Sequence, residues 1–201
     1  MIEGKASGSI NQSCHTWKDA KGAYRLFSND KCVVDEIYDS HHRETGARIK
    51  GHKVIFAIQD TTYLDFDSHK TQGLGSVSKA YKIHKMGLIV HSTLAVTMNG
   101  LPLGLLSQQC WSRPLREETT PEKSKRIYKT SKVNKESYKW ITALKESLKN
   151  VPEDTQIITL VDREADIFDF LWTAKSLGTL FVVRNRQDRK FICLDGVKTK
   201  L

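Results

Sequence analysis

With 201 residues, 39% of them hydrophobic and 27% charged, the chain is long enough for one sizeable core, or for one domain with a smaller appendage. A formal net charge of +9 is commonest in proteins that contact polyanions, nucleic acid ahead of anionic membrane, and a basic protein without such a partner is the alternative. No apolar run approaches the roughly 18 residues of a membrane span and the cysteines form no C-x-x-C pair, so we expect neither a membrane protein nor a zinc site, but a cytoplasmic protein with reduced thiols.

The first half of the chain predicts one helix and then three strands. Apolar residues at helical spacing in "TWKDAKGAYRLF" predict a short amphipathic helix, which we interpret as the remnant of a small N-terminal unit over residues 1–50. The apolar run Lys53–Ile58 predicts a strand buried on both faces, opening a larger domain over residues 51–201. The segments "GLIVHSTLAVTM" and "LPLGLLSQQCW" flank Asn99 and Gly100, which predicts a hairpin with a type I′ turn.

The second half predicts a basic loop followed by alternating helices and strands. Residues 112–135 hold eight Lys/Arg against three Glu and few large apolar residues, which predicts a surface loop able to contact a polyanion. Helices are predicted in 135–150 and 164–177, and strands in 156–161 and 179–184. The order is strand, hairpin, helix, strand, helix, strand. It predicts an α/β protein whose mixed sheet is flanked by helices, which is the element order of the RNase H-like fold.

Two aspartates stand at the ends of buried-looking strands. Asp60 lies two residues beyond the first apolar run, and Asp162 directly follows Gln156–Val161. Carboxylates at the ends of neighbouring strands form a rigid site for a hard cation such as Mg²⁺, which phosphodiester chemistry requires. The alternatives are structural, because Asp162 is also placed to cap a helix and Asp60 to form an Asx turn.

Several segments resemble DDE cut-and-paste transposases of the insertion-sequence-four family, which includes the Tn-five type. "AIQDTTYLDF" and "VDREADIFDFL" resemble the family's two aspartate motifs, and "AKGAYRLF" resembles the end of its N-terminal DNA-binding region. "GLLSQQCWSRP", "NKESYKW" and "FVVRNRQDRK" resemble the segments between and after the aspartates. The resemblance covers nearly all of residues 9–192 in the family's order, and it implies an RNase H-like catalytic domain.

The resemblance also implies roles for individual residues. Asp60 and Asp162 would be the first two members of a catalytic, metal-binding acidic triad. Arg184 and Arg186 match basic positions that reach DNA near the active site, although a solvated strand end is the alternative for both. Lys139 and Arg163 are weaker DNA-binding candidates, for which a surface ion pair is the alternative. Glu164 and Asp166 are expected to stabilise the start of a helix through its dipole rather than to bind metal.

The family's third acid is expected on a later helix, within a Tyr-Arg-Glu-Lys motif. No such motif occurs before Leu201, so we expect an internal piece of a longer transposase, incomplete at both ends. Mg²⁺ or Mn²⁺ would be held weakly by two carboxylates, and DNA cleavage and strand transfer would be lost or nearly lost. The implied partner is DNA, bound in a salt-dependent way, and full-length relatives are expected to act as dimers. The alternatives are a non-catalytic DNA-binding or interaction module and a metal-dependent nuclease that works with two carboxylates.

Overall fold

A computed structural model of the chain describes residues 9–67, 73–78, 85–115, 119–186, 190–192 and 198–200. The chain divides into two compact units, Met1–Ser40 and His41–Leu201. The division falls inside helix α3 (Val34–Ile49), whereas the sequence placed it at residue 50.

The first unit is built from short helices with well-formed N-termini. Helix α1 (Ile10–Ser13) follows a capping box formed by Ser9 and Gln12, and α2 (Trp17–Phe27) follows one formed by Thr16 and Asp19. In each box the hydroxyl accepts a hydrogen bond from a first-turn amide, which satisfies a donor that the helix itself cannot pair. The helix predicted from "TWKDAKGAYRLF" is thereby confirmed as α2.

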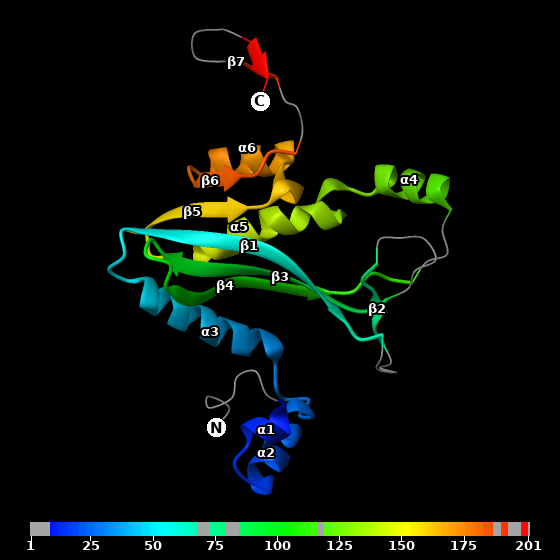
Figure 1. Cartoon of the computed structure of the whole chain (residues 1–201), viewed down its shortest axis with the longest axis vertical. Coiled ribbons are helices and arrows are strands. Elements are labelled where there is room, and N and C mark those ends of the chain that lie inside the picture. Colours follow the sequence, from blue (N-terminus) through cyan, green and yellow to red (C-terminus); the bar gives the residue numbers. More distant parts are fainter. Residues whose placement is uncertain are drawn as a thin grey trace. The chain divides into compact units, whose positions relative to one another are not determined.

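The second unit contains a six-stranded mixed sheet (Figure 1). Its strands are β1 (Val54–Asp65), β2 (Gly75–Ser76), β3 (Met86–Thr97), β4 (Pro102–Trp111), β5 (Gln156–Val161) and β6 (Leu180–Val183). The order is β2-β3-β1-β5-β6, with β4 also paired to β3. Strand β1 is antiparallel to β3 and parallel to β5, and β5 is parallel to β6. The central strand thus joins an antiparallel half to a parallel half, which confirms the predicted mixed sheet.

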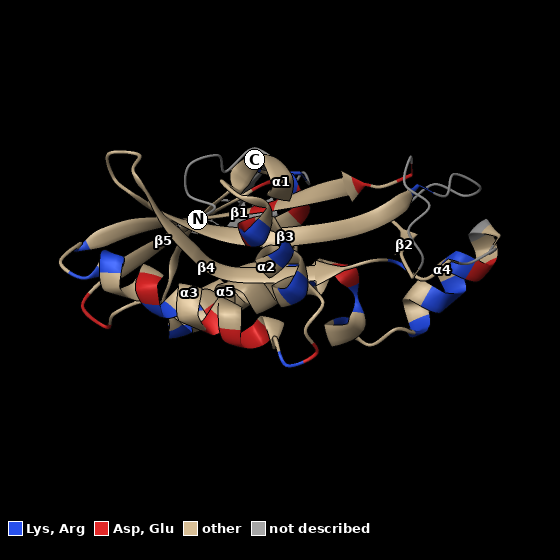
Figure 2. Cartoon of the chain, turned by 90° about the horizontal axis from the view of Figure 1, so that it is seen from below, with Lys and Arg blue, Asp and Glu red and all other residues tan. Residues whose placement is uncertain are grey.

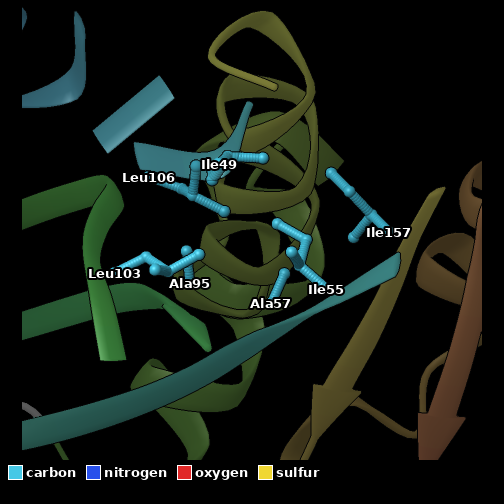
Figure 3. Packing of buried hydrophobic residues seen from close by; sticks show 7 residues of the cluster. All are labelled: Ile49, Ile55, Ala57, Ala95, Leu103, Leu106 and Ile157. Atoms are coloured by element: carbon cyan, nitrogen blue, oxygen red, sulfur yellow. The ribbon is translucent and has the colours of Figure 1, made fainter. Parts of the chain in front are cut away.

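Helices pack against one face of this sheet. The last turns of α3, from His41 onward, and α5 (Lys139–Lys149) lie on the same side of the strands (Figure 2). Helix α6 (Phe168–Ser176) joins α5 over the parallel half, where Trp140 and Phe170 are almost fully buried. The cluster under α3 consists of Ile49, Ile55, Ala57, Ala95, Leu103, Leu106 and Ile157 (Figure 3). Burial of these apolar side chains is the main stabilising term for the sheet.

The opposite face of the sheet is less buried. Strands alternate their side chains between two faces, so Ile58, Leu180 and Val182 point away from α5 and α6. They are 36%, 48% and 59% exposed, respectively. Among the described residues of the second unit, helices therefore cover one face of the sheet only.

The β3–β4 hairpin is confirmed, but its turn differs from the predicted type I′. The Gly100 N–H donates to the Thr97 carbonyl at 2.9 Å, and the Thr97 N–H donates to the Leu101 carbonyl at 2.9 Å. These bonds close a loop of three residues, Met98 to Gly100, in which Gly100 has φ +85°. Such loops combine a tight turn with one left-handed residue, a conformation that glycine adopts without strain.

Part of the predicted basic loop over 112–135 is helical. Helix α4 (Thr120–Lys129) starts at a capping box of Thr119 and Glu122 with Pro121 in the first turn, and short 3-10 turns, η2 (Lys132–Asn134) and η3 (Glu136–Tyr138), lead into α5. Helix α4 was not predicted because it lacks a broad apolar stripe, but Glu, Lys and Arg are good helix formers and the capping box supplies its start.

Two further strands, β7 (Lys190–Ile192) and β8 (Lys198–Lys200), pair with each other near the C-terminus. None of the helices in the described ranges combines the length and the apolar character needed to cross a bilayer.

Candidate functional site

Asp60 lies inside strand β1, not beyond its end as the sequence predicted. The apolar run of β1 stops at Ile58, but the strand continues through Asp65 because β3 pairs with this second half as well. Asp60 pairs with Ser92. The β-branched Thr61 and Thr62 also favour this extension. An extended ladder holds the Asp60 backbone rigidly, and an Asx turn at Asp60 is incompatible with it.

Asp162 directly follows β5, as predicted. It is the N-cap of a short 3-10 turn, η4 (Arg163–Ala165), and its Oδ1 accepts a hydrogen bond from the Glu164 N–H at 2.7 Å. The capping role that the sequence left open is therefore present. This capping hydrogen bond uses one of the two carboxylate oxygens, and the Asp162 side chain remains exposed.

The strand register brings the two aspartates together. Ile58 of β1 pairs with Leu160 of β5, and Asp60 and Asp162 each lie two residues further along these parallel strands. Neighbouring strands run about 4.8 Å apart, so the two backbones are close where the pairing ends. Both aspartates also point to the same face, because their neighbours Gln59 and Val161 are buried on the other one.

The pair suits a divalent cation of the Mg²⁺ type. Both side chains are exposed, and among the residues that the structure describes the Asp60 carboxylate has no hydrogen-bond or ion-pair partner. Mg²⁺ takes oxygen ligands and retains several waters, so two carboxylates provide part of a coordination shell. No group of three or more His, Cys, Asp or Glu side chains suited to a metal occurs within the described ranges.

The other acids of "DREAD" hold the turn in place. The Glu164 carboxylate receives the Lys139 ammonium at 3.3 Å, and the buried Asp166 accepts a hydrogen bond from the Arg186 N–H at 2.9 Å. Helix α6 begins only at Phe168, and its N-cap residue Ile167 makes no side-chain hydrogen bond. Glu164 does lie in the first turn of η4, whereas Asp166 follows that turn, so the expected place at a helix start is wrong for Asp166.

The four basic residues proposed to bind DNA lie in different environments. Arg163, Arg184 and Arg186 are exposed, and the Arg184 N–H extends the β6 pairing to the Val161 carbonyl. Asp166 ties the backbone of Arg186 to the turn that follows Asp162. Lys139, in contrast, has a side chain only 4% exposed, and its ammonium also lies 5.2 Å from the Trp140 ring centre. Lys139 is therefore in an ion pair, as in the alternative, but its side chain is buried rather than at the surface.

A buried polar group beneath Asp60 was not anticipated from the sequence. His91 of β3 is fully buried, with its Nδ1 2.8 Å from the Thr61 hydroxyl and its ring edge-on to Trp140 at 4.5 Å. Its Nε2 lies 3.4 Å from the Gln59 carboxamide oxygen. Burial, and then the nearby Lys139 charge, lower the pKa of His91 to about 4, so the imidazole is neutral at pH 7. The one signal in the sequence was a histidine interrupting an apolar strand.

Comparison with known proteins finds similarity to transposases. Residues 2–32 match the family model described as "Transposase DNA-binding". The chain is also similar to solved structures titled "Mos1 transposase paired-end complex with left transposon end" (11% identity, 90% of this chain and 55% of that chain, TM-score 0.30) and "Crystal structure of the Mos1 Strand Transfer Complex" (11% identity, 92% and 56%, TM-score 0.33). The chain thus spans little more than half the length of those proteins. At these identities and TM-scores, no role of an individual residue follows from the solved structures.

Proposed function

We propose that the chain is part of a transposase of the DDE type, which binds DNA and presents Asp60 and Asp162 as a carboxylate pair for a divalent cation. The observation that carries the proposal is the parallel register of β1 and β5, which sets both acids on one face at neighbouring positions. The strand order, with an antiparallel hairpin next to two parallel strands, supports an RNase H-like catalytic domain.

DNA binding is proposed for the N-terminal unit because residues 2–32 match a transposase DNA-binding family. Helix α2 carries exposed Lys18, Lys21 and Arg25, whose spacing of three and four residues places them along one stripe. Cations so arranged contact successive phosphates without reading base sequence. DNA affinity should therefore fall steeply with salt.

A bound divalent cation would activate an attacking oxygen and offset charge on the phosphoryl group. The chain's own residues supply position: β1 fixes the backbone of Asp60, the η4 turn holds Asp162 at its N-cap, and Asp166 holds the Arg186 backbone at the same turn. The exposed Arg186 guanidinium is suited to bind a phosphate oxygen of the DNA strand that carries the reacting phosphoryl group. With two acids and no third in the proposed set, we expect weak metal binding and little cleavage.

Calorimetric titration with Mn²⁺ tests the metal site. Asp162→Asn removes the charge but keeps an oxygen that can cap η4, because Asn is as good an N-cap as Asp. We expect this variant and Asp60→Asn to lose the binding heat of the wild type, while Asp154→Asn, at an exposed acid outside the pair, keeps it. Equal Mn²⁺ binding by wild type and Asp60→Asn would refute the shared site.

A non-catalytic DNA-binding module is the second candidate. It is favoured by the family match, which covers only the DNA-binding segment, and by the lack of a three-acid group within the described ranges. A supercoiled-plasmid nicking assay with Mg²⁺ separates the candidates. Nicking that disappears in Asp60→Asn supports a two-carboxylate nuclease, whereas salt-dependent binding without nicking or metal uptake supports the module.

A further inference from the structure

His91 bridges the two residues that flank Asp60 in β1. Its Nδ1 lies 2.8 Å from the Thr61 hydroxyl, and its Nε2 lies 3.4 Å from the Gln59 carboxamide oxygen. Because side chains alternate along a strand, Gln59 and Thr61 both point to the face opposite the Asp60 carboxylate. One imidazole ring therefore holds β1 at the two positions that decide where Asp60 points.

The ring also interacts with the main chain of Asp60 itself. Burial and then the Lys139 charge lower the pKa of His91, and a hydrogen bond with the Asp60 backbone opposes this shift. Such a bond forms only where the ring lies close to the main chain. His91 thus contacts three consecutive residues of β1, with Asp60 in the middle.

The His91 side chain is itself held in a fixed position. It is fully buried and packs edge-on against the ring of Trp140, with the two ring centres 4.5 Å apart. Trp140 is 1% exposed and belongs to the buried cluster that α5 forms with α6. Close packing on this side leaves the imidazole no room to follow a movement of β1. The contacts of His91 therefore restrain the strand rather than move with it.

Strand β1 has fewer strand partners at Asp60 than in its first half. Its pairing with β5 runs from Val54 to Ile58, and beyond Ile58 the described ladder of β1 continues with β3 alone, where Asp60 is opposite Ser92. Backbone with fewer hydrogen bonds opens locally at a lower free-energy cost. His91 thus contacts β1 where the second ladder has ended.

The start of α5 also supports the turn of Asp162. Lys139, the neighbour of Trp140, lies 3.3 Å from the Glu164 carboxylate, and the Glu164 N–H donates to Asp162 Oδ1 at 2.7 Å. The first two residues of α5 therefore contact the supports of both aspartates, His91 on the side of β1 and Glu164 on the side of β5. Two carboxylates share one cation only if their separation is fixed, which gives such supports a purpose.

We propose that His91 is a positioning residue for the cation site, which orients Asp60 toward Asp162 by holding the two neighbours of Asp60 in β1. The imidazole acts from the opposite face of the sheet and does not touch the cation. This inference rests on the proposed function, because it assigns a support to the proposed carboxylate pair.

The test compares variants that remove a buried hydroxyl with and without a contact to His91. Thr61→Val deletes the hydroxyl that contacts the ring but keeps the shape and strand preference of the side chain, and Thr61→Ser retains the hydroxyl. Thr93→Val is the matched control, because Thr93 is buried on the same face of β3 and its hydroxyl has no hydrogen-bond partner among the described residues. His91→Phe deletes both polar contacts and keeps a ring against Trp140.

Electron paramagnetic resonance, which detects free Mn²⁺, gives the affinity of each variant for Mn²⁺. We expect Thr61→Val and His91→Phe to bind Mn²⁺ roughly tenfold more weakly, as is typical when a residue that orients a metal ligand is lost, and Thr61→Ser and Thr93→Val to bind it like the wild type. Because the two changes remove the same support, the double variant should bind no more weakly than His91→Phe alone.

Backbone ¹⁵N relaxation without metal gives an independent readout. The order parameter of the Asp60 amide should fall in Thr61→Val and His91→Phe, and should keep the wild-type value in Thr93→Val. Circular dichroism melts of all variants give the stability change. A purely structural His91 would lower the melting temperature but leave the Mn²⁺ affinity and the Asp60 order parameter unchanged, and that result would overturn the positioning role.

Two further results separate this inference from the proposed function. If the wild type binds Mn²⁺ and Thr93→Val weakens binding as much as Thr61→Val does, contact with His91 is not what matters, and the carboxylate site stands without it. If the wild type binds no Mn²⁺, the proposed carboxylate site is overturned, and the positioning role with it.

Discussion

The ammonium of Lys139 lies 3.3 Å from the Glu164 carboxylate, although the lysine side chain is 4% exposed and the glutamate 38%. The pair joins the first residue of α5 to the η4 turn, which Asp162 caps. Two partners of unequal burial respond differently to mutation, because water can solvate the glutamate but not the lysine once its partner is gone.

We therefore predict that Glu164→Gln destabilises the protein more than Lys139→Met. The first variant leaves a buried ammonium without its counter-charge and should cost roughly 2–4 kcal/mol of unfolding free energy. The second leaves an apolar chain of similar volume against Trp140 and a carboxylate that can hydrate, which should cost about 1 kcal/mol or less. Urea unfolding at pH 7 measures both.

The control is the exposed pair of Lys149 and Glu146, 2.7 Å apart on α5. Lys149→Met should change stability by less than about 0.5 kcal/mol, because solvent screens exposed ion pairs. If Lys139→Met lowered the free energy of unfolding more than Glu164→Gln, the prediction that an unpaired Lys139 ammonium is the costly group would be wrong.

Because His91 is buried, we predict that the protein loses stability in mild acid. Its pKa is lowered to about 4 in the folded protein, by burial first and then by Lys139, against 6.5 as its ordinary value. The unfolded chain therefore binds the proton more readily, and stability falls as pH drops from 6.5 toward 4. From pH 7 to pH 5 this group alone should cost about 2 kcal/mol. Glu164, whose charge opposes the shift, limits it.

Urea unfolding of wild type and His91→Gln at pH 7 and pH 5 checks the prediction. The variant retains a polar side chain opposite Thr61 but has no proton to bind, so its stability should change much less between the two pH values. Lys139→Met should show an intermediate response, since removing the cation raises the pKa of His91. A wild type as stable at pH 5 as at pH 7 would contradict the neutral buried imidazole.

What the sequence predicted well are elements with strong local patterns. The run "QIITLV" became β5 with the predicted bounds, and the apolar stripe of "TWKDAKGAYRLF" became α2. The end of β1 was misplaced because its second half is set by pairing with β3, a long-range partner that no local pattern encodes. Helix α4 was missed because its start depends on a cap rather than on apolar spacing.

The candidate site divides in the same way. Asp60 and Asp162 could be selected because each follows an apolar run, yet their shared face depends on the β1–β5 register, which the sequence alone does not give. Lys139 looked like a surface lysine in "NKESYKW", since nothing local shows that Glu164, 25 residues later, is its partner. Long-range pairing decides which charged residues are buried.

Asp166 should control the order of the segment that carries Arg186. The residue is 4% exposed, and its carboxylate accepts a hydrogen bond from the Arg186 N–H at 2.9 Å. Asp166→Ala removes this acceptor, which should cost about 1–3 kcal/mol and expose the Arg186 amide to exchange. Hydrogen exchange measured by NMR should show faster exchange at Arg186 while the amides of β5 change little. Asp169→Ala, which removes an exposed partner of Lys132, should leave the Arg186 amide unaffected.

Gly104 in the β3–β4 hairpin is predicted to tolerate substitution poorly. Its φ is +134°, and a Cβ there would collide with the Thr45 hydroxyl and crowd the Arg48 guanidinium of α3. The Arg48 Nε–H also donates a hydrogen bond to the Leu103 carbonyl at 2.5 Å. This bond holds α3 close to β4, so the helix cannot move away to make space for a Cβ. Gly104→Ala should therefore cost roughly 2–4 kcal/mol, from backbone strain and overpacking together.

Gly100→Ala provides the matched control in the same hairpin. Its φ is +85°, but a Cβ there meets nothing within 4 Å, so only the strain of about 1 kcal/mol remains. Urea unfolding gives the free energy of unfolding of both variants. The strain of a positive φ is common to the two, so the difference between their losses measures the collision of the Gly104 Cβ with α3. Equal losses would mean that α3 shifts readily on β4, and would contradict a fixed contact between Gly104 and the side chains of Thr45 and Arg48.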